Sequence, residues 1–206
     1  MVYVIVFGSL LLLLGLLCAV FYLLVKLPGR VTLSIVLVTV GGSYFTFNSY
    51  ERAFQLSVVP DALAVTTVEY SEEEAWGFGP GGNEAGIRVY SLPEAVANAI
   101  SSQGLGFLNT MPANANQRER RWRGYYTDWK ETPVSPQRIW EPQEAKGTLD
   151  VMHYICAYGF CIDVAQEYVD EANELVNAPG SYYAFGRIGM ILVAPARKRV
   201  YYLYNG

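Results

Sequence analysis

The sequence predicts an α+β protein anchored in a membrane: an N-terminal two-helix transmembrane hairpin precedes one soluble domain with an antiparallel sheet and about two helices. Two uncharged apolar runs, 2–25 and 31–48, predict the hairpin, because a helix crosses a hydrocarbon core with about 20 residues. All acidic residues lie at Glu51 or later, so the soluble domain is expected over 50–206. In that part, strand-like segments neighbour one another in the sequence, which favours an antiparallel sheet.

A short hinge between the two runs sets the expected topology. It contains Lys26 and Arg30, and lysines and arginines near helix ends favour the cytoplasmic side. We therefore expect a two-pass protein of the inner membrane whose soluble domain is extracytoplasmic. The first run has no charged side chain before it and no small-residue cleavage pattern, which favours a membrane helix over a cleaved signal peptide.

Small residues predict how the two membrane helices pack. Gly8, Gly15 and Ala19 are spaced by seven and four residues, so they share one face of the first helix. Gly41 and Gly42 give the second helix a similar smooth surface. Small side chains let helix backbones approach closely in a bilayer. Neither run contains an acidic or basic residue, which argues against an ion path or a proton relay.

The soluble domain is predicted to begin and end with hairpins. Residues 64–70 and 86–90 are expected to pair, with a glycine-rich loop between them. Residues 183–194 are apolar on both faces, which predicts a central strand, and 200–204 is its expected partner.

Two helices and one irregular segment are predicted between these hairpins. Ser91 and Glu94 have the spacing of a capping box, and Gly104 would end the first helix. Apolar residues recur at helical spacing over 162–176, which predicts the second. Residues 111–142 contain four prolines and match neither pattern. A loop of that length is usually either functional or disordered.

A run of arginines and aromatic residues in the irregular segment is the candidate interaction surface. Such side chains dominate protein-binding hot spots, although the same run could be an ordinary exposed segment whose aromatics cover the core. From Glu51 onward, 13 basic and 19 acidic residues give a net charge of −6, which argues against nucleic acid as a partner. The surface comprises Arg118, Arg121, Trp122, Arg123, Tyr125, Tyr126 and Trp129.

Cys156 and Cys161 are the candidate disulfide pair, because nearby thiols outside the cytoplasm tend to oxidise. The bond requires a turn between them, and Gly159 is well placed for one. A metal site that includes His153, a nucleophilic Cys–His pair and two buried free thiols are the alternatives. No complete metal-ligand set or cofactor motif is present in the sequence, so no metal and no cofactor are expected.

These patterns favour a non-enzymatic, membrane-anchored interaction protein. Its partners would be the lipid bilayer and either another protein or a second copy of the chain. An immunity-type protein and an accessory subunit of a membrane complex are two concrete forms. A thiol-active enzyme of the envelope and a ligand-sensing domain are the alternatives.

Overall fold

The computed structural model describes residues 22, 26–75, 84–137, 140–142, 147–159 and 161–206. The chain divides into two compact units, Met1–Arg52 and Ala53–Gly206. The described residues form six α-helices and a six-stranded antiparallel sheet, which confirms the α+β class. The first apolar run, 2–25, lies outside the described residues except for Tyr22, so the first membrane helix of the hairpin, and with it the two-helix hairpin, stays a prediction.

Helix α2 (Gly29–Leu56) is long and apolar enough to cross a membrane. Its side chains suit an apolar surrounding, because Ser34, Thr39 and Thr46 each donate a hydrogen bond to the carbonyl four residues earlier, at 2.8–2.9 Å. Gly41 and Gly42 are exposed on this helix. Gly8, Gly15 and Ala19 lie outside the described residues, so the predicted helix packing stays untested.

The sheet has the strand order β1-β2-β6-β5-β4-β3, and every neighbouring pair is antiparallel. As predicted, the first hairpin (β1 Val68–Ala75, β2 Glu84–Ser91) precedes the helices and the last strands follow them. The first strand, predicted over 64–70, instead begins four residues later and runs through the acidic residues 72–74. The strand predicted over 183–194 is instead two strands, β4 (Tyr182–Phe185) and β5 (Gly189–Ala194). The turn between them begins at Gly186, where a Cβ would meet the Tyr126 ring at 2.8 Å.

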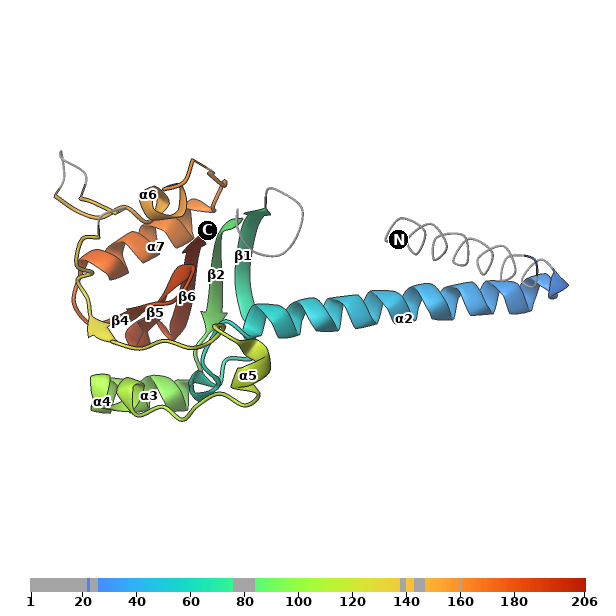
Figure 1. Cartoon of the computed structure of the whole chain (residues 1–206), viewed down its shortest axis with the longest axis horizontal. Coiled ribbons are helices and arrows are strands. Elements are labelled where there is room, and N and C mark those ends of the chain that lie inside the picture. Colours follow the sequence, from blue (N-terminus) through green and yellow to red (C-terminus); the bar gives the residue numbers. More distant parts are fainter. Residues whose placement is uncertain (1–21, 23–25, 76–83, 138–139, 143–146, 160) are drawn as a thin grey trace, which may run out of the picture. The chain divides into compact units, whose positions relative to one another are not determined.

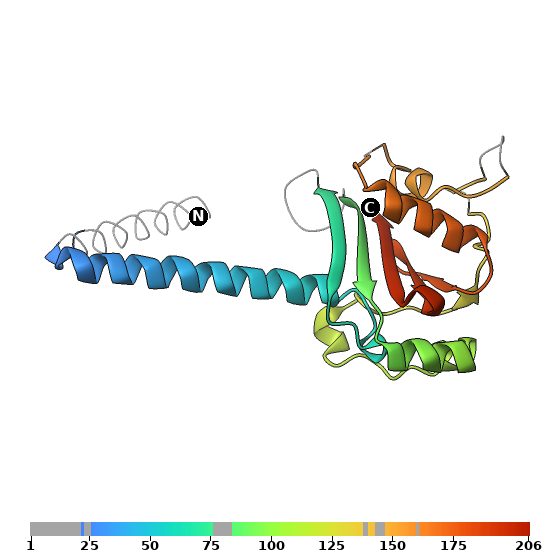
Figure 2. The ribbon, with the colours of Figure 1, turned by 180° about the vertical axis from the view of Figure 1, so that it is seen from behind.

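Helices cover both faces of the sheet (Figures 1 and 2). Helices α6 (Val151–Ile155) and α7 (Gln166–Asn177) lie on one face over apolar side chains such as Ile87, Leu192 and Leu203. Helices α3 (Glu94–Gln103) and α4 (Leu105–Asn109) lie on the other. The buried strand β5 and its partner β6 (Arg199–Asn205) occupy the centre of the sheet. Alternating residues of the central strands therefore contribute to two separate cores.

The two long helices of the second unit, Ala53–Gly206, match the prediction, with shifted ends. Helix α7 begins four residues later than expected, and α3 begins at Glu94 after Pro93. Ser91 does not cap α3; it ends β2 and donates to Glu69 of β1 at 2.6 Å. Three short helices were not predicted: α4, α5 (Gln117–Arg120) and α6. Helices of four or five residues are too short to produce a recognisable apolar period.

The irregular segment 111–142 packs onto the domain over most of its described length. It contains α5, the two-residue strand β3 (Lys130–Glu131) and the buried side chains of Trp129, Val134 and Trp140. Trp140 donates from Nε1 to the carbonyl of Asp150 at 2.7 Å, which fixes the end of the segment to α6. The segment is therefore long because it crosses from one face of the domain to the other.

Candidate functional site

The predicted interaction surface divides into an exposed and a buried part. Arg118, Arg121 and Tyr125 are exposed, whereas Trp122 and Arg123 are half-buried. Trp129 is only 5% exposed and belongs to the core on the α3 side of the sheet. Trp129 is therefore not part of the accessible surface, because its ring packs between segment 111–142 and the sheet.

Tyr126 also points inward. Its hydroxyl donates to the carbonyl of Val58 at 2.9 Å, and its ring lies 6.0 Å from that of Trp129. Burial raises the pKa of Tyr126 well above its ordinary value. Tyr126 therefore contacts the segment 57–61 from the inside of the domain, and its ring is not part of the accessible surface.

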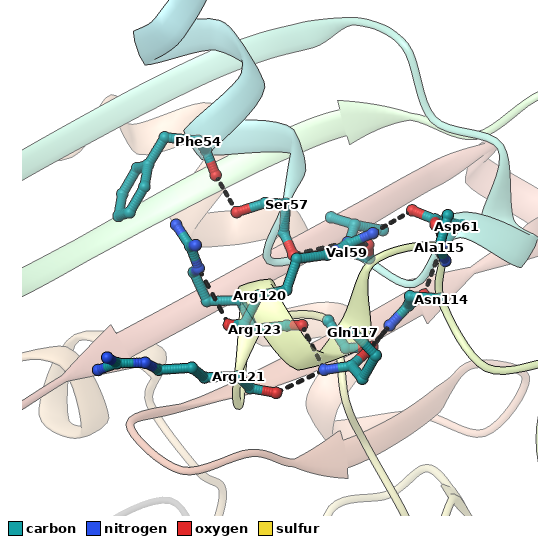
Figure 3. A network of polar contacts seen from close by, with 11 residues as sticks. Phe54, Ser57, Val59, Asp61, Asn114, Ala115, Gln117, Arg120, Arg121 and Arg123 are labelled. Carbon is teal, nitrogen blue, oxygen red and sulfur yellow. Dashed lines mark hydrogen bonds and ion pairs between the residues drawn. The ribbon is translucent and has the colours of Figure 1, made fainter.

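Arg120 connects the exposed part of the predicted interaction surface to residues 57–61 through its guanidinium group (Figure 3). Its guanidinium donates to the carbonyls of Ser57 at 2.7 Å and Val59 at 2.8 Å, and it pairs with the carboxylate of Asp61. Ser57 and Val59 follow directly after α2, so these acceptors belong to the turn that leaves the helix. A cation from α5 thus stabilises the turn that leads from α2 into the domain.

Two amides fix the loop that carries Arg120. The buried Asn114 accepts from the backbone of Asp61 at 2.7 Å and donates to the carbonyl of Gly124 at 2.6 Å. Gln117 donates to the carbonyls of Arg121 and Arg123 (Figure 3). The loop is held so firmly that three non-glycine residues take left-handed φ angles near 55–59°, namely Asn116, Arg121 and Asp128. Such conformations persist where the surroundings determine them, often at functional sites.

A second arginine cluster lies beside Phe54. The guanidinium of Arg123 lies 4.9 Å from the centre of the Phe54 ring, and that of Arg88 lies 5.9 Å from it. Arg88 is 4% exposed, pairs with Glu73 and stacks over the Tyr204 ring at 5.1 Å. The pKa of Tyr204 is raised chiefly by burial, with Arg88 opposing the shift.

Two depressions flank the Arg120 network. An open groove of about 640 Å³ is lined by residues 53–65 and 115–123, including Arg120 and Arg123. A smaller hollow of about 230 Å³ lies on the other side of Pro60, against Tyr125, Tyr126 and Trp129. Residues of the irregular segment 111–142 therefore line both depressions.

The cysteine pair lies away from this region, at the end of α6. Cys156 and Cys161 are joined by a disulfide, with a Cα–Cα distance of 4.7 Å. The predicted turn is present: Gly159 donates to the carbonyl of Cys156 at 2.9 Å and has φ of +87°. Within the described ranges, no group of three His, Cys, Asp or Glu side chains is placed to hold a metal ion.

Sequence reasoning did not identify Arg120, Asn114 or Asp61 as a unit. Arg120 belongs to a visible basic run, but the run does not show which arginine points inward, since that depends on acceptors about 60 residues away. The sequence matches no protein-family model, and neither curated proteins nor solved structures provide a match.

Proposed function

We propose that this chain is a non-enzymatic interaction protein of the inner membrane, whose soluble domain binds a partner protein at the outer face. Helix α2 supplies one membrane span, and the apolar run 2–25 is the second. The partner surface consists of Arg118, Arg121, Trp122 and Tyr125. An accessory subunit of a membrane complex and an immunity-type protein both fit this description.

One observation carries the proposal: exposed arginines stand on a fixed loop without acidic partners. Arg118 and Arg121 are exposed, and no ion pair links either of them to another described residue. The Arg121 carbonyl accepts a hydrogen bond from the Gln117 side chain at 2.5 Å, and Arg118 lies in α5. A preorganised loop loses little entropy on binding, so these side chains suit recognition better than they suit internal stability.

Charge indicates the kind of partner. From Glu51 onward the chain has a net charge of −6, yet 118–123 contains four arginines and one glutamate. A local basic patch on an acidic domain favours an acidic partner surface. Tyr125, with 60% of its surface exposed, provides the aromatic contact beside the arginines.

Photo-cross-linking tests the proposal. A photoreactive phenylalanine analogue replaces Tyr125 in the full-length chain, and cross-linked species are isolated from membranes in mild detergent. The matched control places the analogue at Tyr158, which is equally exposed at 60% but lies beside the disulfide. We expect one protein adduct at Tyr125 that Arg118→Glu with Arg121→Glu abolishes and Arg187→Glu preserves. Identical adducts at both positions, or none at Tyr125, would refute the assigned surface.

A further inference from the structure

Strand β1 forms one edge of the sheet, and its outer side is unpaired. The strand order places β1 at the end of the sheet, as both views show (Figures 1 and 2). Residues 70–75 pair with β2 in continuous register, and their backbone has no hydrogen-bond partner outside β2 in the described part of the chain. Because residues alternate in an antiparallel pair, half of these positions direct their N–H and C=O groups away from β2. The outer side of β1 can therefore pair with a further strand.

Side chains on both faces of the sheet hold β1 in its extended form. On the α7 face, the ring of Tyr70 stacks on that of Tyr168, with 4.3 Å between the ring centres. On the opposite face, Glu73 pairs with Arg88 and accepts a hydrogen bond from the Tyr204 hydroxyl. A strand that is fixed before binding loses little entropy when another strand pairs with it.

The four glutamates of β1 divide into two that are used within the domain and two that are not. Glu69 accepts a hydrogen bond from Nε of Arg199 at 2.8 Å, and Glu73 belongs to the ion pair described above. Glu72 and Glu74 are exposed, and neither forms an ion pair with another described residue. Since they are two residues apart on a strand, both side chains project from the same face, beside the unpaired edge.

We propose that the outer edge of β1 binds an extended, basic segment of a partner protein as an added strand. Backbone hydrogen bonds to residues 70–75 hold the segment, and basic side chains two residues apart in it lie opposite Glu72 and Glu74. A second copy of the chain fits this edge poorly, because β1 paired with β1 would bring glutamates of the two copies together. The edge lies within the unit Ala53–Gly206 and shares no residue with the partner surface proposed above.

Fluorescence anisotropy with labelled peptides tests the strand pairing. The probe is a peptide of alternating lysine and valine, added to the full-length chain in detergent micelles. Two further peptides carry N-methyl groups on all lysines or on all valines, so each has lost the hydrogen-bond donors of one edge. We expect one methylated peptide to bind as the parent does and the other to lose binding. A peptide of alternating glutamate and valine should bind at least about tenfold more weakly than the parent, because its charges oppose those of β1.

Charge reversal and hydrogen exchange test the location. Glu72→Lys with Glu74→Lys should weaken binding of the lysine peptide by about tenfold and permit binding of the glutamate peptide. The matched control, Glu131→Lys with Glu141→Lys, changes the net charge equally at exposed positions, one of them in β3 at the opposite edge of the sheet. It should behave as the wild type. The lysine peptide should also slow amide hydrogen exchange within 70–75 of the wild type, a measurement that needs no variant.

Three results would overturn the assignment. Equal binding of the two methylated peptides would indicate charge attraction without strand pairing. Slowed exchange elsewhere in the chain, with none within 70–75, would place the peptide on another surface. A wild-type dimer in native mass spectrometry that the lysine peptide dissociates would identify a second copy of the chain as the occupant of the edge.

Discussion

Arg120 joins segments that are about 60 residues apart in the sequence, and its contribution can be measured. Arg120→Met keeps much of the apolar stem but leaves the carbonyls of Ser57 and Val59 without their donor. Unsatisfied, partly buried groups cost about 1–3 kcal/mol, and the half-exposed Asp61 adds little. We expect the free energy of unfolding to fall by about 2–3 kcal/mol in urea denaturation. Arg118→Met, an exposed change on the same short helix, should stay within about 0.5 kcal/mol.

Gly86 is required because the Tyr204 ring lies directly over it. A Cβ at this position would fall 2.3 Å from the ring, and the ring is held by stacking on Tyr202 and by its hydrogen bond to Glu73. Gly86→Ala should therefore lower the free energy of unfolding by about 1–3 kcal/mol, as overpacking does. Gly106→Ala, in a helix with open space around it, should be neutral or slightly stabilising. Equal effects of the two changes in thermal denaturation would contradict the close contact.

Buried tyrosines predict a loss of stability at high pH. Burial raises the pKa of Tyr90, Tyr202 and Tyr204 above the ordinary value of 10.0. Above pH 10 the unfolded chain loses these phenolic protons while the folded chain keeps them, so stability must fall as pH rises. Absorbance of tyrosinate should show these three buried tyrosines ionising only together with cooperative unfolding. Ionisation of the three buried tyrosines without loss of structure would disagree.

At the level of elements, the disulfide closes a small loop between α6 and the approach to α7. In the chain-entropy description a loop this short contributes only about 2 kcal/mol. Reduction should lower the melting temperature by a few degrees and leave the sheet folded, as followed by circular dichroism. Alkylation of unfolded, unreduced protein should modify Cys18 alone. Modification of all three cysteines in protein trapped at lysis would show that the bond does not form in the cell.

The first hairpin, β6 and α7 could be predicted because the sequence of each shows a local pattern. Alternation near 64–70 identified the first hairpin, the turn after 194 placed β6, and the apolar period identified α7. The β4–β5 hairpin was missed because both of its strands are buried on both faces, so no polar residue marks the turn before Arg187.

The candidate site could be predicted only in part. The exposed arginines belong to a visible run, but the inward positions of Arg120, Tyr126 and Trp129 depend on packing against residues 57–61 and the sheet. Arg88 and Glu73 carried no signal at all, since their pairing is set by strand register. Long-range acceptors, which no local pattern encodes, decide which charged side chains become structural.

For the whole molecule, the two-pass topology is the expectation on which the proposed function depends. The hinge contributes Lys26 and Arg30, whereas only Arg52 stands close after the second run, so the hinge should remain in the cytoplasm. A disulfide in the soluble unit agrees with an oxidising compartment.

Paired reporter fusions test this topology in intact cells. Alkaline phosphatase gains activity only outside the cytoplasm because it needs its own disulfides, whereas green fluorescent protein exported unfolded stays dark. Fused after Gly206, the phosphatase should be active and the fluorescent protein dark, and fusions in the hinge near Gly29 should give the reverse. Deleting the first run, 2–25, is the decisive control, because α2 is then the only span left of the proposed hairpin. Phosphatase and fluorescence activities of the Gly206 fusions then show whether the first span is needed for the orientation. An active phosphatase at Gly29 and an inactive one at Gly206 would place the arginine surface in the cytoplasm, and the partner would have to be sought there.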